Sequence, residues 1–154
     1  MIDRINRKIL TILQSNARTS NAEIARRVDM APSAVLERIR KLERSGVIQG
    51  YEARVNPKSL DLGLTAFTKV RAEERVGATD TGEALATIPN VLEVHYCAGQ
   101  DSYLVKVRAS SAEGLAETLA RIGQIPTVKD TNSTIVLRTV KETNILPVPP
   151  DPEP

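Results

Sequence analysis

The feature that most constrains the fold is a three-residue break, Asp29-Met30-Ala31, between two short amphipathic segments. The first segment begins at a capping box, in which Ser20 and Glu23 are expected to satisfy each other's backbone amides. The second begins at Pro32, because proline suits a first helical position where its missing amide would be unbonded anyway, and it ends before Gly46. Two short helices joined by so tight a turn predict a helix-turn-helix.

A supporting helix is predicted before this pair. Asp3 can cap it, and its apolar residues recur at a spacing that places them on one face: Ile5, Ile9, Ile12 and Leu13. In the third helix, Val35, Ile39 and Leu42 share a face and must point to the core. Residues 1–50 are therefore expected to form a three-helix DNA-binding domain of the winged helix-turn-helix type.

The other face of the third predicted helix has small residues at its start and basic residues further along. Small side chains permit close approach to base edges in a major groove, and arginine and lysine reach bases or phosphates. Glu37 would repel phosphates, but it can accept from a cytosine amino group or orient a neighbouring arginine. A merely solvated helix face is the alternative. The predicted DNA-binding residues are Ser20, Asn21, Ser33, Ala34, Glu37, Arg38, Arg40, Lys41 and Arg44.

Charge is divided along the chain in a way that favours DNA contact. Residues 1–58 contain 12 lysines and arginines against 6 acidic residues, a net charge of +6. The remaining residues contain 9 against 13, a net charge of −4. Such asymmetry is expected when only one part of a protein meets a polyanion, although chance segregation of solvated charges gives the same count.

The second half alternates segments typical of strands and helices, after an expected hinge strand and linker over 51–63. Strands are predicted at 64–73, 91–98, 103–109 and 131–140. Helices are predicted at 79–88 and after a capping box at Ser110–Glu113. This order predicts an α+β protein, with a ferredoxin-like βαββαβ domain at 64–142. A proline-rich tail, 143–154, is expected to be extended or disordered.

The same order of elements occurs in RNA-recognition motifs, which stack bases on aromatic residues of their central strands. Aromatic residues make up only 3% of this sequence, and no predicted strand carries a basic-glycine-aromatic core. This half of the chain is also acidic. Binding of nucleic acid by the predicted sheet is therefore not expected.

Other classes of function find little support. No Ser-His-Asp set, glycine-rich phosphate loop or pair of catalytic carboxylates stands out, so we predict no enzyme activity, no catalytic residue and no cofactor. His95 and Cys97 share a predicted strand without a third ligand, which favours a packed strand face over a metal site. No apolar run approaches the roughly 20 residues that span a bilayer. With its single cysteine, the protein is expected in the cytoplasm, with no membrane partner.

The pattern of residues over 35–57 resembles the signature of the leucine-responsive/asparagine-responsive (Lrp/AsnC, feast/famine) regulators. The pattern reads Val35-x-x-Arg38-Ile39-x-x-Leu42-Glu43-x-x-Gly46-Val47-Ile48-x-Gly50-Tyr51, followed by Asn56-Pro57. The likeness extends from Asp3 to about Lys141. It implies a transcription regulator that binds double-stranded DNA, pairs its sheets into homodimers and assembles these into octamers or other rings. Ala31 departs from the family's usual serine cap, at a cost of roughly 1 kcal/mol.

The same resemblance implies an effector site. In the family, a glycine-containing loop between two strands and a segment of the last strand line a pocket for an amino acid between subunits. The matching residues here are Gly99, Gln100, Asp101, Ser102, Tyr103, Thr131, Asn132, Ser133 and Thr134. Glycine opens backbone amides to a carboxylate, and an aspartate or hydroxyl can receive an ammonium. Many members have an acidic residue directly before the tyrosine, whereas this chain has Ser102 there and Asp101 one position earlier. A plain hairpin turn is the alternative.

Two functions are weighed at this point. The favoured one is a DNA-binding transcription regulator that responds to a small metabolite. The other is a ligand-binding sensor that does not bind DNA. Salt-dependent binding to a duplex distinguishes them, because phosphate neutralisation makes affinity depend steeply on salt.

Overall fold

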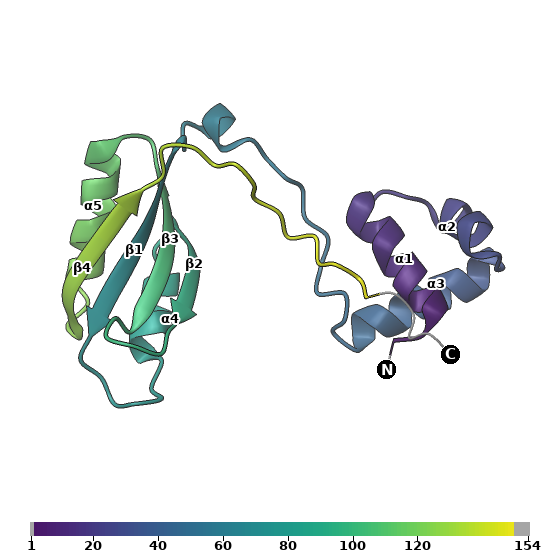
Figure 1. Ribbon diagram of the computed structural model, residues 1–154, viewed down its shortest axis with the longest axis horizontal. Helices are drawn as coiled ribbons and strands as arrows, with labels where there is room; N and C mark the ends of the chain where they lie inside the picture. Colours follow the sequence, from purple (N-terminus) through teal and green to yellow (C-terminus); the bar gives the residue numbers. More distant parts are fainter. Residues whose placement is uncertain (1, 150–154) are drawn as a thin grey trace. The chain divides into compact units, whose positions relative to one another are not determined.

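The computed structural model describes residues 2–149. The described residues form two compact units: 2–53 together with 141–149, and Arg54–Val140. The first unit is helical, and the second contains a four-stranded sheet with two helices (Figure 1). The tail, which the sequence marks as a separate segment, thus belongs to the helical unit. Over residues 2–149, no helix is long and apolar enough to cross a membrane.

The helical unit contains α1 (Arg4–Ser15), α2 (Asn21–Val28) and α3 (Pro32–Arg44). The Asp3 carboxylate accepts from the Asn6 amide at 2.7 Å, which caps α1 as predicted. Ser20 caps α2 by accepting from the Glu23 amide at 3.2 Å. The expected return bond from Glu23 is replaced, because its carboxylate pairs with two arginines of the same helix, Arg26 and Arg27.

The turn between α2 and α3 is the predicted three-residue break. Asp29 adopts a left-handed conformation, with φ at 56°, and Pro32 is the first residue of α3. Ala31 gives α3 no side-chain cap. One contiguous core holds the three helices together, and its buried residues are Ile9, Leu13, Ile24, Ala25, Val28, Val35, Ile39 and Leu42. The apolar face predicted for α3 is therefore confirmed.

The second unit has the predicted βαββαβ order. Its strands are β1 (Leu64–Ala72), β2 (Val91–Tyr96), β3 (Tyr103–Ala109) and β4 (Val128–Ile135), and its helices are α4 (Asp80–Ala86) and α5 (Ala112–Gly123). The sheet is antiparallel, in the order β2-β3-β1-β4. A short 3-10 helix, η1 (Pro57–Leu60), lies at the turn expected near Asn56.

Two elements of this unit, β4 and α5, have bounds that differ from the predicted ones. The last strand was expected at 131–140, but β4 starts earlier because Val128 pairs with Ala72. It ends earlier because it reaches the beginning of β1. Ile135 is opposite Ala66, and the Val136 amide makes the last bond, to the Thr65 carbonyl. The predicted cap of α5 is also shifted by one residue. Ser111, not Ser110, accepts from the backbone of the first turn, at the Gly114 amide.

The two faces of the sheet differ in what covers them. Helices α4 and α5 lie against one face (Figure 1), where the buried core includes Val70, Tyr103 and Val105. Because side chains alternate along a strand, the residues on either side of these in sequence point to the other face of the sheet. On this open face Phe67 is 38% exposed beside polar neighbours. The open face is defined here by Phe67, Lys69, Leu104, Lys106, Asn132 and Thr134.

Candidate DNA-binding and effector sites

Helix α3 presents most of the predicted DNA-binding residues to solvent. Ser33, Glu37, Arg40, Lys41 and Arg44 are all exposed. These residues follow one another at helical spacing opposite the buried Val35, Ile39 and Leu42, so burial of one face fixes the orientation of the other. The basic side chains occupy the middle and end of the helix, as its sequence predicts.

The charge of Glu37 is compensated by an arginine of the same helix. Its carboxylate accepts from the Arg44 guanidinium at 2.8 Å. This hydrogen bond, with the charges of Arg44 and Arg40, lowers the pKa of Glu37. This contact is compatible with one of the two roles considered for Glu37, the orientation of a neighbouring arginine.

Arg38 differs from the other predicted contacts, because its side chain turns toward α1. Its guanidinium donates to the Asp3 carboxylate at 2.6 Å and to the Asn6 side chain at 3.0 Å. The Asn6 backbone amide and the Arg38 guanidinium both lower the pKa of Asp3. Arg38 therefore joins the start of α1 to the middle of α3.

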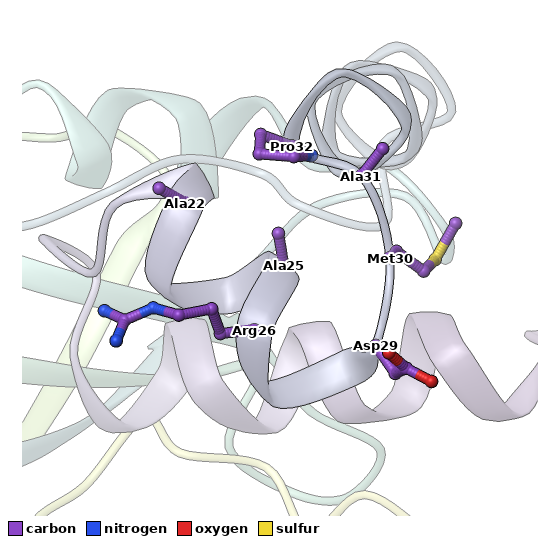
Figure 2. Close-up of a pocket in the computed structure, with 7 residues that line it drawn as sticks. All are labelled: Ala22, Ala25, Arg26, Asp29, Met30, Ala31 and Pro32. Atoms are coloured by element: carbon purple, nitrogen blue, oxygen red, sulfur yellow. The ribbon is translucent and has the colours of Figure 1, made fainter.

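A shallow hollow of about 580 Å³ opens where α2 meets the start of α3. Figure 2 shows Ala25 between α2 and the start of α3, with Ala22 one turn earlier. The Arg26 side chain extends along α2 away from the turn residues. Three of the seven lining residues are alanines, and these leave room close to the backbone of both helices. Ser20 and Asn21, also predicted to contact DNA, stand at the opposite end of α2 from the turn.

The predicted effector loop is a hairpin between β2 and β3, which the Cys97 amide closes by donating to the Ser102 carbonyl at 2.9 Å. Gly99 has φ at 140°, a conformation that side chains disfavour, so glycine is needed there. The Ser102 hydroxyl bonds both the amide and the carbonyl of Ala72, at 3.3 and 3.2 Å. Gln100 is exposed at the tip. The loop is thus tied to the end of β1.

The segment of β4 predicted to form the second wall lies across β1 from this hairpin. Val70 is opposite both Tyr103 and Thr131, so one strand separates the two predicted walls. Because side chains alternate along β4, the residues of this segment are divided between the two faces of the sheet. Ser133 bonds the buried Thr68 hydroxyl at 2.8 Å on the helix-covered side, whereas Asn132 and Thr134 belong to the open face.

Lys69 is a residue that the sequence reasoning missed. Its ammonium lies 3.7 Å from the Asp101 carboxylate, and its backbone is opposite Asn132 in β4. Lys69 therefore lies next to one residue of each predicted wall of the effector site, Asp101 of the hairpin and Asn132 of β4. A lysine in a strand carries no signal for this role, because the contact depends on sheet register.

Tyr103 occupies a different position from its neighbours in the loop, since its side chain is 1% exposed on the helix-covered face. Its hydroxyl donates to the Glu74 carboxylate, which also accepts from the amide and hydroxyl of Thr81 at 3.2 and 2.8 Å. Burial, followed by the Glu74 bond, raises the pKa of Tyr103 to about 12. Glu74 supplies the side-chain cap that Thr79 does not give to α4. Neither residue pattern nor spacing singles out Glu74.

His95 and Cys97 carry no metal-site geometry. His95 lies 3.3 Å from Glu93, which also accepts from Lys106 at 2.9 Å. The expectation that His95 packs into the protein is wrong for the single subunit, because its side chain is largely exposed at the outer strand β2. Over residues 2–149, no three His, Cys, Asp or Glu side chains are grouped to hold a metal ion.

Comparison with known proteins identifies the family of each unit. Residues 2–49 match the winged helix-turn-helix DNA-binding family, and residues 65–146 match the Lrp/AsnC ligand binding domain. The leucine-responsive regulatory protein of Escherichia coli is 39% identical over 153 residues, which cover 94% of this chain and 90% of that protein.

Solved structures give the same result over nearly the whole chain. A feast or famine regulatory protein from M. tuberculosis, complexed with L-methionine, is 34% identical, with a TM-score of 0.89 over 97% of this chain and 100% of that one. A transcriptional regulator from Neisseria meningitidis, also complexed with L-methionine, is 32% identical, with a TM-score of 0.85 over 96% and 97% of the two chains. These relatives are regulatory proteins. The chain belongs to the Lrp/AsnC family of DNA-binding, ligand-responsive transcription regulators.

Proposed function

We propose that the effector of this regulator is a free amino acid, bound where Lys69 and Asp101 meet at the end of the sheet. The observation that carries the proposal is the pairing of opposite charges at 3.7 Å on partly exposed side chains. A zwitterion carries the complementary pair, with its carboxylate for Lys69 and its ammonium for Asp101. Two relatives whose structures contain L-methionine support this class of ligand.

The Lys69–Asp101 pair is suited to exchange partners with such a ligand. An exposed ion pair stabilises a protein by only about 0–1 kcal/mol, so little is lost when an effector separates it. Gly99 keeps the loop backbone accessible to a carboxylate, and Asn132 and Thr134 offer polar groups from β4. Tyr103 and Ser102 then hold the loop in place through Glu74 and Ala72.

We further propose that the protein pairs through the open face of its sheet into homodimers, which assemble into octamers or other rings. Phe67 is exposed there on a strand whose opposite face is fully packed. A second copy would cover it, and the effector site would then be shared between subunits. The DNA-binding residues proposed above would read two half-sites about one helical turn (~34 Å) or a multiple apart. The protein would act in the cytoplasm, with the DNA it binds.

Calorimetry with each of the twenty amino acids against the intact oligomer tests the effector proposal. We expect at least one to bind below about millimolar, and Asp101→Asn and Lys69→Gln each to weaken that binding at least tenfold. Lys58→Gln, an exposed lysine in η1, is the matched control and should bind as the wild type does. If no amino acid binds, this effector class is wrong for the protein.

Light scattering tests the assembly. Phe67→Glu places a charge on the open face and should reduce the oligomer to smaller species. Val76→Glu, in a loop where the side chain is 93% exposed, should leave the mass unchanged. A wild-type protein that is monomeric at micromolar concentration would contradict the proposal.

A further inference from the structure

The C-terminal segment Ile145–Pro149, called the strap below, is bound to helix α1 although more than 130 residues separate them in sequence. The Gln14 side chain accepts from the Leu146 amide at 2.7 Å and donates to the Leu146 carbonyl at 3.0 Å. The Arg7 guanidinium donates to the Pro149 carbonyl at 3.4 Å. These contacts explain why the chain from Lys141 onward belongs to the helical unit.

Backbone recognition, rather than apolar burial, holds the strap. The Leu146 side chain is 72% exposed, so its side chain contributes little. One glutamine satisfies both backbone groups of Leu146, as a neighbouring strand would. The prolines at 147 and 149 fix φ and favour an extended backbone, which lowers the entropy lost when the segment docks.

The strap also closes one side of a groove of about 430 Å³ on α1. Val148 and Pro149 form one wall, and the basic residues Arg4, Arg7 and Lys8 lie on α1 around it, with Arg27 contributed by α2. The docked strap therefore lies among several cations of the DNA-binding unit.

Hydrogen bonds continue from the strap to the recognition helix. Arg7, which binds Pro149, also donates through Nε to the Ile2 carbonyl at 3.2 Å. The next residue, Asp3, and Asn6 accept from Arg38 of α3. Strap, start of α1 and α3 thus form one connected set of polar contacts. The strap lies C-terminal to β4, after residues 136–144, so it is a second covalent connection to the sheet besides the linker before β1.

We propose that the strap is a positioning device for the recognition helix, so that strap docking and DNA binding reinforce each other. The docked strap holds Arg7 and the start of α1, and these hold Arg38 and α3. Linkage is reciprocal: if docking increases DNA affinity by some factor, DNA binding strengthens docking by the same factor. Gln14 binds backbone groups of the strap, so any residue except proline at position 146 can make these contacts.

Two substitutions undock the strap from opposite sides. Leu146→Pro deletes the amide that Gln14 accepts from, and Leu146→Ala is its control because it keeps both backbone groups. Gln14→Leu removes both bonds from the α1 side, with Gln124→Leu, an exposed glutamine after α5, as its control. Leu146 lies outside the core of the helical unit, so the result for Leu146→Pro stands even if Gln14→Leu fails to fold.

Fluorescence anisotropy measures binding of each full-length variant to a duplex that the wild-type protein selects from a random library. We expect Leu146→Pro and Gln14→Leu to lower affinity about fivefold or more, the lower end of usual coupling between sites. Both controls should bind as the wild type does. The salt dependence should be unchanged, because no cation has been removed.

Two results would overturn the proposal. Unchanged affinity in Leu146→Pro would mean that the strap does not position α3. Tighter binding with a steeper salt dependence would mean that the strap shields cations of the groove from phosphates. The experiment needs no effector, so neither result bears on the proposed amino-acid site.

Discussion

The two units build their proposed functional surfaces in different ways. In the helical unit, one helix carries Arg40, Lys41 and Arg44, and its buried face fixes where they point. In the sheet unit, Lys69, Asp101 and Asn132 come from three separate segments, and pairing of strands brings them together. The first surface follows from local periodicity. The second exists only when the sheet has its correct register.

The difference teaches where each unit is vulnerable. The two cores share no residue, so a core change in one unit should leave the other folded. An exposed change on α3 should alter binding without altering stability. A change in the packing behind the effector loop should alter both, because Tyr103 joins the loop to the core.

The largest effect is expected from Arg40→Ala combined with Lys41→Ala. Loss of base contacts of about 1–3 kcal/mol each should weaken duplex binding by about a hundredfold, and each lost phosphate contact should lower the salt slope by about one. Unfolding of the helical unit should not change. Arg121→Ala, an exposed basic residue of α5, is the control. A double variant that binds as tightly as the wild type would remove α3 from the DNA-binding surface.

Gly82→Ala should show the opposite behaviour, with lost stability in the sheet unit alone. A Cβ at this position would lie 2.7 Å from a ring carbon of the buried Tyr103. Overpacking of this kind costs about 1–3 kcal/mol, which urea unfolding measures. Gly123→Ala, where a Cβ meets nothing within 4 Å, should be neutral or slightly stabilising. Equal unfolding of the two variants would argue against the close packing of α4 on Tyr103.

Tyr103→Phe should remove a smaller, pH-dependent contribution, about 1.5 kcal/mol for a hydrogen bond to a charged group. Burial raises the pKa of Glu74, but bonds from Tyr103 and Thr81 outweigh it, so that pKa is lowered overall. Its contribution is present at neutral pH and is lost as the pH falls through the lowered pKa. The raised pKa of Tyr103 contributes below its ordinary value near 10 and is lost as the pH rises through about 12.

Unfolding measured against pH checks this prediction. The wild-type sheet unit should lose its advantage over Tyr103→Phe at both the acid and the alkaline end. A constant difference between the two proteins across the whole range would show that the hydroxyl contributes no linked protonation.

The smallest effect is expected from Ala31→Ser, which returns a side-chain cap to α3. Helix α3 begins without one, and a serine at this position stabilises a helix by about 1 kcal/mol. The midpoint of unfolding of the helical unit should rise while that of the sheet unit stays constant. Ala34→Ser, within the first turn, offers a control without the capping geometry.

Sequence alone predicted the features that depend on neighbouring residues. The caps at Asp3 and Ser20, the break before Pro32 and the buried face of α3 all involve residues within one or two turns. Features that depend on distant partners were missed or misplaced. The bounds of β4 follow from pairing with β1, and Lys69 meets Asp101 only through the register of the sheet.

The tail illustrates the same limit. Its prolines predict an extended or disordered segment, and nothing in that composition indicates that Gln14 would bind Leu146. Tyr103 could be identified as part of the loop, whereas its partner Glu74 lies 29 residues earlier without a motif. Contacts between residues close in sequence can be predicted from the sequence, whereas contacts between distant residues are known only once the fold is known.

The most direct test of the account is the affinity for a selected DNA duplex measured with and without each of the twenty amino acids. At least one amino acid should change the affinity of the wild-type protein about fivefold or more, as expected for coupled sites. Asp101→Asn should abolish that change while it leaves ligand-free DNA binding intact. An affinity that no amino acid alters, or a response that survives unchanged in Asp101→Asn, would contradict the account.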